Sequence, residues 1–174
     1  LTAVAEVLML FDFPLPFAPS FYKIDLSEVP ILIGCFAMGP AAGIIIEAMK
    51  ILLNFIISGT VTAGVGELAN FAIGCSMVLP AGLIYRYHKT RKNAVLGMAA
   101  GTLVMAAIGG LLNAFVLLPA YAALFGGMDA IIGMGTAVNK NITSVQSFVL
   151  LSVVPFNLVK GVIVSLVTFL LYKH

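Results

Sequence analysis

Long apolar runs alternate with short polar, glycine-rich or proline-rich segments along the whole chain of 174 residues. About 20 apolar residues in helical conformation cross the hydrocarbon core of a bilayer, so runs of this kind are typical of transmembrane helices. The pattern therefore predicts an all-α membrane protein with six transmembrane helices. We place them at residues 1–10, 27–38, 41–57, 67–87, 94–118 and 147–172.

Two long connections separate these predicted helices. The first, residues 11–26, contains three prolines and is therefore unable to continue a regular helix. Ser27 followed by Pro30 is typical of a helix start. The helix that it opens is short, so we expect it to tilt, to stop partway, or to share its burial with the loop. The second connection, residues 119–146, is glycine-rich and has room for short helical pieces.

The composition agrees with the membrane assignment. Hydrophobic residues make up 61% of the chain and charged residues 9%, and the mean hydropathy is +1.14, whereas about 25% of residues are charged in an average soluble domain. Six helices occupy nearly the whole length, so we expect one transmembrane domain over residues 1–174, with the first helix truncated at its start. The net charge is only +2 and the basic residues form no stripe, which argues against nucleic acid as a partner.

Basic residues mark one end of the predicted bundle. Loops on the cytoplasmic side of membrane proteins carry an excess of lysine and arginine, so the basic turn after the fourth helix is assigned to the cytoplasm. Six crossings then place both termini in the cytoplasm and both long connections outside. The residues that carry this assignment are Arg86, Lys89, Arg91, Lys92 and, after the last helix, Lys173.

Polar side chains occur deep inside the predicted membrane helices. A charged side chain at such a depth costs at least about 2.5 kcal/mol on insertion scales, so it normally faces a partner or a water-filled cavity. The pattern therefore predicts a polar pocket that opens outward. The residues concerned are Glu47, Lys50 and Asn54, which share one face of the third helix, and Asn113, Asn157 and Lys160 on the fifth and sixth.

Structural roles compete with the pocket interpretation. Lys160 has Glu47 as a possible ion-pair partner, and Glu47 has Lys50 on its own helix. Asparagine in a membrane helix often joins two helices by hydrogen bonds, which is the alternative for Asn113 and Asn157.

Motifs for catalysis are absent from the sequence. It contains no H-E-x-x-H pair, no nucleophile elbow and no phosphate-binding loop. We therefore expect neither an enzyme nor a metal site, and any ATP-driven step must rely on partner proteins. The G-x-x-x-G spacings at residues 39–43 and 97–101 indicate close helix packing instead of chemistry.

Several separated motifs, taken in order, resemble those of one protein family. They are "FDFPLPFAPSFYKIDLSEVP", "ELANF", "LLNAFVLLP" and "VVPFNLVKG", and over nearly the whole chain they are similar to the riboflavin-specific S components of energy-coupling factor (ECF) vitamin transporters. The resemblance implies a six-helix substrate-binding domain in the bacterial plasma membrane that captures riboflavin from outside, as a transported ligand and not as a cofactor. It also implies a transmembrane coupling protein and two cytoplasmic ATPases as partners. The family's first helix carries an A-x-x-x-A motif that contacts the coupling protein, and Ala3 matches its second alanine.

The resemblance also implies roles for individual residues. A stand-alone ion- or proton-coupled carrier that uses Glu47 and Lys160 is the alternative, and it would need no ATPase. In the S-component interpretation, residues just before the second helix form part of the outer wall or lid, namely Tyr22, Asp25 and Leu26. The ligand contacts are Asn113, Asn157 and Lys160, together with Glu47, Lys50 and Asn54.

Overall fold

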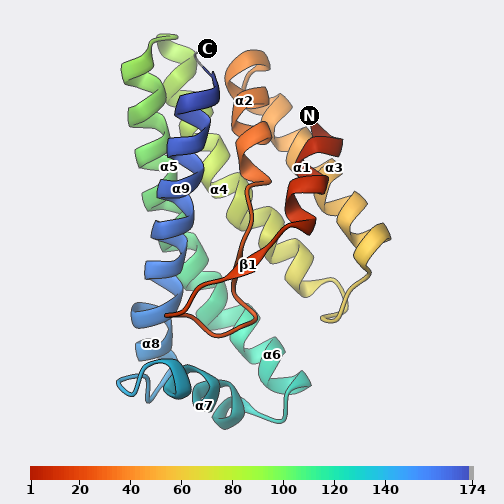
Figure 1. Cartoon of the computed structure of the whole chain (residues 1–174), viewed down its shortest axis with the longest axis vertical. Helices are drawn as coiled ribbons and strands as arrows, with labels where there is room; N and C mark the ends of the chain where they lie inside the picture. The colour runs from red at the N-terminus through yellow and green to blue at the C-terminus, as the bar shows by residue number, and fades with distance from the viewer. Residues whose placement is uncertain (173–174) are drawn as a thin grey trace.

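The computed structural model describes residues 1–172 as a helical bundle with one short β-hairpin (Figure 1). Lys173, which was expected to close the last helix at the basic end, lies outside the described residues, as does His174. Strands β1 (Phe13–Pro14) and β2 (Lys23–Ile24) pair in antiparallel orientation. The short helices are α1 (Thr2–Leu10), α2 (Glu28–Met38), α7 (Met128–Val138) and α8 (Val145–Phe148).

Four helices within the described residues are long and apolar enough to cross a membrane. Two are single elements, α3 (Pro40–Ser58) and α4 (Val65–Tyr87). The other two are composite: α5 (Arg91–Leu112), η1 (Asn113–Leu117) and α6 (Leu118–Leu124) run on as one helix, and α8, η2 (Val149–Val153) and α9 (Val154–Tyr172) as another.

The prediction of an all-α membrane bundle is confirmed, but six full crossings are not. Helix α1 has 9 residues and α2 has 11. At about 1.5 Å per residue, each is much shorter than the roughly 30 Å hydrocarbon core.

Helix α2 lies at the centre of the bundle despite its length. Eight of its residues are buried, and it contacts α1, α3, α4 and α9. It ends at Gly39, whose φ of 102° favours glycine, and Pro40 then opens α3 at once. The preceding loop shares the burial, because Ile24 and Asp25 are enclosed as well. The expectation that this helix stops partway therefore agrees with the structure.

The fifth predicted helix was placed too short. It was expected to end at residue 118, but the helix continues through Pro119 to Leu124. The wide π turn η1 ends two residues before Pro119, and η2 ends two residues before Pro155. Proline has no N–H to donate to the carbonyl four residues before it, and its ring clashes with that carbonyl. The wider π turn gives the ring space and shifts the hydrogen-bond pattern by one residue, so the helix continues through the proline.

Helices α4 and α5 pack closely through glycines of α5. A Cβ placed on Gly97 would lie 2.7 Å from the carbonyl oxygen of Ala81, and one on Gly101 would also collide with the backbone of α4, at Met77. The close packing predicted from the spacing at residues 97–101 is therefore confirmed.

The two ends of the bundle differ in character (Figure 1). The turn between α4 and α5, the turn between α2 and α3, and the end of α9 lie together at one end. At the other end lie α6, α7, α8 and the loop of residues 11–27 with its β-hairpin. Buried apolar side chains at this end, including Ile24 of the loop, Leu118 of α6 and Phe148 of α8, pack together and hold the loop against these helices.

Candidate functional site

A cavity of about 170 Å³ lies under the loop of residues 11–27, between α4, η1 and α9. Four segments of the chain therefore meet at one polar space. The residues that line it come from the loop (Phe21, Tyr22, Lys23, Asp25), from α4 (Gly66, Asn70, Ile73), from the fifth predicted helix (Asn113, Leu117, Tyr121) and from α9 (Phe156, Asn157, Lys160).

Lys160 enters the cavity from α9 and meets a carboxylate of the loop. Its Nζ lies 3.2 Å from Oδ2 of Asp25, and both side chains are about nine-tenths buried. Burial alone would raise the pKa of Asp25, but the ammonium of Lys160, the charge of Lys50 and hydrogen bonds from Ser27 bring it down to about 2. The carboxylate is therefore ionised at neutral pH and holds the loop to α9.

Asn113 forms a second attachment between loop and helix. Its side-chain NH₂ donates to the carbonyl of Gly109 at 2.7 Å, one turn back on the same helix, so its Oδ1 is left to face the cavity. The hydroxyl of Tyr22 donates to that oxygen. Burial raises the pKa of Tyr22 well above its ordinary value of 10, which keeps the hydroxyl protonated and able to donate.

Asn157 on α9 is held in the same way. Its NH₂ donates to the carbonyl of Val153 at 3.1 Å, again one turn back. In both asparagines the NH₂ group bonds to the residue's own helix, which leaves the side-chain carbonyl oxygen as the acceptor. Asn113 is the first residue of the π turn η1, and Asn157 lies four residues after the end of η2 and two after Pro155. Wide turns of this kind are frequent at functional sites.

Aromatic rings form the rest of the wall. Phe21 lies 4.7 Å from Tyr22 and 5.4 Å from Tyr121 between ring centroids, and Tyr22 lies 5.4 Å from Phe156. Phe21 and Phe148 are parallel, with an interplanar angle of 6°. A cavity with aromatic sides and a few fixed polar atoms suits a flat ligand that carries heteroatoms.

Other charged residues of the predicted pocket lie outside the cavity. Nζ of Lys50 is completely enclosed, 2.9 Å from Glu47 and 3.1 Å from Glu28, and it also donates to the hydroxyl of Ser27. Pairing of Glu47 with Lys50 on one helix, which the spacing indicated as an alternative, is therefore what the structure shows. The other alternative, an ion pair between Lys160 and Glu47, is wrong because Lys160 pairs with Asp25.

The remaining predicted residues are also separate from the cavity. Asn54 donates to Glu6 of α1 at 3.2 Å and so joins α3 to α1. Leu26 is partly buried against the core around α2. Ala3 is exposed on α1, as a residue at a partner surface must be. The structure thus brings together five of the nine predicted substrate-site residues: Tyr22, Asp25, Asn113, Asn157 and Lys160.

Sequence reasoning missed several cavity residues. Asn70 belongs to the "ELANF" motif and carried a signal, since it is a polar residue inside an apolar helix. Phe21, Tyr121 and Phe156 carried none, because aromatic residues are common in any membrane helix or loop.

Comparison with known proteins gives the class of this chain. The sequence model of a family described as "ECF transporter, substrate-specific component" matches residues 1–172. The chain belongs to this family. As a substrate-specific component of an ECF transporter, it is a multi-pass protein of the bacterial cell membrane.

Individual relatives agree with the family. The chain is 36% identical over 174 residues to "Riboflavin transporter RibU" of Staphylococcus aureus (strain TCH60), covering 100% of this chain and 85% of the relative. It is 33% identical over 173 residues to "Riboflavin transporter FmnP" of Bacillus subtilis (strain 168), covering 99% and 86%.

A solved structure, described as the S component of a bacterial ECF transporter, matches with a TM-score of 0.77 and 37% identity, over 99% of this chain and 88% of that one. These relatives are transport proteins, in agreement with the expectation that the chain is not an enzyme. They also support the transporter-subunit prediction over the stand-alone carrier.

Proposed function

We propose that this substrate-specific component captures riboflavin from outside the cell and delivers it to an ATP-driven ECF transporter. The observation that carries the proposal is the cavity under the loop, where Lys160 and two asparagines meet a wall of aromatic rings. The relatives named as riboflavin transporters support the choice of vitamin.

The chemistry of riboflavin fits this set of side chains. Its tricyclic ring needs flat apolar walls, which Phe21, Tyr121 and Phe156 would supply. Its ring edge and its ribityl chain need donors and acceptors. We assign these contacts to Asn113, Asn157 and Lys160, with Asn70 added from α4, and we assign Tyr22, Asp25 and Leu26 to the outer wall.

Binding requires the loop of residues 11–27 to move. Pockets for ligands of this size usually measure about 300 Å³ or more, whereas the cavity measures about 170 Å³. The bonds of Tyr22 to Asn113 and of Asp25 to Lys160 hold the loop down. A riboflavin molecule that took over the polar groups of Asn113 and Lys160 would compete with both attachments, so we propose that it enters beneath a lifted loop.

Glu47, Lys50 and Asn54 take a supporting role in this proposal. Lys50 of α3 bonds to Ser27 and Glu28 at the start of α2. These two residues follow Asp25 by two and three positions. The buried network therefore fixes the point from which the loop hinges. A direct contact of these three side chains with the vitamin would require a larger rearrangement than lifting the loop.

We further propose that the chain passes six times through the membrane region, with both termini in the cytoplasm. In Figure 1, α1 and α2 run in opposite directions, as do α2, α3, α4, α5 and α9 in turn. The basic residues between α4 and α5 support a cytoplasmic position for that end. Helices α1 and α2 then penetrate from this side, and the loop of residues 11–27 lies toward the outer side.

The proposed partners are a transmembrane coupling protein and two cytoplasmic ATPases. The sequence itself has no ATP-binding motif. Ala3 is exposed on α1, where a small side chain allows another helix to approach closely.

The experiment is purification of the protein from cells supplied with riboflavin, followed by reconstitution in vesicles. We expect a yellow protein that binds riboflavin one to one and transports it only when the coupling protein and the ATPases are present. Transport of riboflavin by the protein alone, driven by an ion gradient, would instead support the stand-alone carrier. Absence of any flavin binding by a folded protein would contradict both versions.

A further inference from the structure

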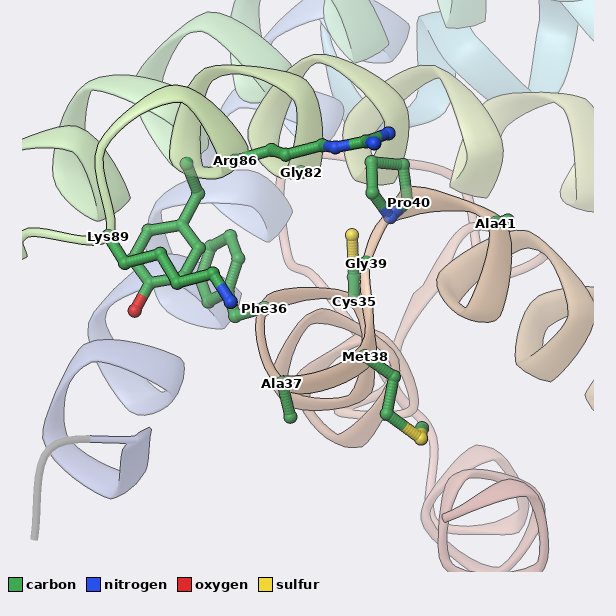
Figure 2. A pocket seen from close by; sticks show the side chains of 11 residues that line it. Cys35, Phe36, Ala37, Met38, Gly39, Pro40, Ala41, Gly82, Arg86 and Lys89 are labelled. Atoms are coloured by element: carbon green, nitrogen blue, oxygen red, sulfur yellow. The ribbon is translucent and has the colours of Figure 1, made fainter.

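A second pocket, of about 300 Å³, lies at the opposite end of the bundle from the riboflavin cavity. It is formed where the end of α2 turns into α3 and meets the end of α4 (Figure 2). Cys35, Phe36 and Gly82 are buried at its floor, whereas Met38 and Ala41 at its edge are exposed. The pocket therefore has an apolar floor and opens on the flank of the bundle.

Two cations of α4 and the following turn reach into this opening. Figure 2 shows Arg86 extended toward Pro40 and Lys89 ending near Phe36. Within residues 1–172, neither cation lies within 4.0 Å of a carboxylate, unlike the three paired lysines at residues 23, 50 and 160. The lining contains no acidic residue. Two positive charges at one apolar pocket thus have no internal counter-charge in the described part of the chain.

The start of α3 adds a third element of positive potential. No side chain caps this helix, because Gly39 is at its N-cap position and Pro40 follows. The N–H of Ala41 is directed out of the helix start and has no backbone or side-chain acceptor among the described residues. A helix of 19 residues has a partial positive charge at this end, so the helix start adds to the positive potential that the two cations give the pocket.

We propose that this pocket binds the phosphate of an anionic phospholipid, with the glycerol carbons over Phe36 and Met38. A soluble anion would use the cations and the helix start but not the apolar floor. A lipid uses both, and the exposed Met38 and Ala41 continue the apolar surface at the edge of the pocket. The inference goes beyond the proposed riboflavin transport. It shares with that proposal only the topology, which places this end in the leaflet where anionic lipids and basic pockets between helices meet.

The test uses the full chain in a neutral detergent and short-chain phosphatidylglycerol as the probe. We expect binding of phosphatidylglycerol, measured by native mass spectrometry, and much weaker binding of short-chain phosphatidylcholine. Each basic residue near an anionic surface contributes about 1 kcal/mol, which corresponds to a factor of about five in affinity. The double variant Arg86→Gln, Lys89→Gln should therefore bind phosphatidylglycerol roughly 20- to 30-fold more weakly. The matched control is Arg91→Gln, Lys92→Gln, which removes the same charge from residues outside the pocket lining.

Several outcomes would overturn the proposal. Equal losses in the double variant and in its control would mean that only the overall charge matters. Binding of inorganic phosphate or glycerol 3-phosphate as tightly as the lipid would assign the site to a soluble anion. Unchanged lipid binding with lost binding of the coupling protein would make this face a protein contact. Riboflavin binding serves as the folding control, and the variant Ala37→Phe, which fills the pocket and keeps both cations, should lose the lipid as well.

Discussion

Replacement of the buried pair between Asp25 and Lys160 gives the sharpest test of the riboflavin site. In the single variant Lys160→Met, the carboxylate of Asp25 stays buried and keeps its hydrogen bond from the backbone N–H of Ser27 at 2.8 Å, but it loses the ammonium that pairs with it. Breaking a buried ion pair on one side typically costs about 3 to 5 kcal/mol of unfolding free energy. The single variant should therefore unfold at a lower temperature, whatever the role of Lys160 in binding.

The double variant Asp25→Asn, Lys160→Met separates the two roles. It removes both charges and preserves an acceptor for Ser27, so its stability should return to within about 1 kcal/mol of wild type, as expected when both partners of a buried pair are replaced. If Lys160 donates to riboflavin, the double variant should still bind about 5- to 150-fold more weakly, since an unpaired buried polar group costs roughly 1 to 3 kcal/mol.

The assay is titration of riboflavin fluorescence, with thermal unfolding measured without ligand. Asn54→Leu is the control, because Asn54 was also a predicted contact but lies on the far side of the buried network and bonds to Glu6. Its affinity should stay unchanged. Wild-type affinity in the double variant would refute a ligand role for Lys160 and reduce it to a clamp for the loop.

Three further results are expected. Ala3→Phe should weaken binding to the coupling protein and leave riboflavin affinity unchanged. Val4→Phe, on a different face of α1, should change neither of these two affinities. A loss of riboflavin binding with normal docking in Ala3→Phe would contradict the assignment. Gly101→Leu should lower the unfolding free energy by about 1 to 3 kcal/mol, because the new side chain separates α5 from α4. Gly133→Ala is the control, because a Cβ at that position meets no atom within 4 Å. Equal unfolding temperatures for Gly101→Leu and wild type would rule out this packing. The pKa of Asp25 is lowered from 3.8 to about 2, so its contribution of about 2 kcal/mol should be complete above about pH 5 and lost as the pH falls through 4 toward 2. Wild type should therefore lose most of this unfolding free energy relative to the double variant, which has no carboxylate at residue 25, and a difference that stays constant with pH would exclude this origin.

Parts of the fold follow directly from local sequence signals. The end of α2 at Gly39, the start of α3 at Pro40 and the end of α4 before the basic turn lie within a few residues of the predicted boundaries. Each depends on a residue with one strong backbone preference or on a sudden change in polarity. The pairing of Glu47 with Lys50 was also accessible, since a spacing of three residues places two side chains on one helix face.

Other parts depend on contacts that no local pattern contains. The fifth helix was predicted to end at residue 118, because sequence gives no sign that a π turn just before Pro119 lets the helix continue. Lys160 was recognised as exceptional, but its partner Asp25 lies 135 residues away on an irregular loop. The position of such a loop is decided by tertiary packing, so the partner, and the exclusion of Lys50 from the cavity, became visible only with the fold.

The enclosed network around Lys50 also has a consequence for how the protein enters the membrane. A lone α3 would carry Glu47 and Lys50 into lipid, each at a cost of about 2.5 to 3.5 kcal/mol on insertion scales. Glu28 on α2 meets Lys50 at 3.1 Å, and only Gly39 separates the two helices. Because α2 leaves the ribosome first, the pair is available as soon as α3 emerges. The unit that partitions into the bilayer is therefore the α2–α3 hairpin, in which Lys50 already pairs with carboxylates of both helices, and not either helix alone.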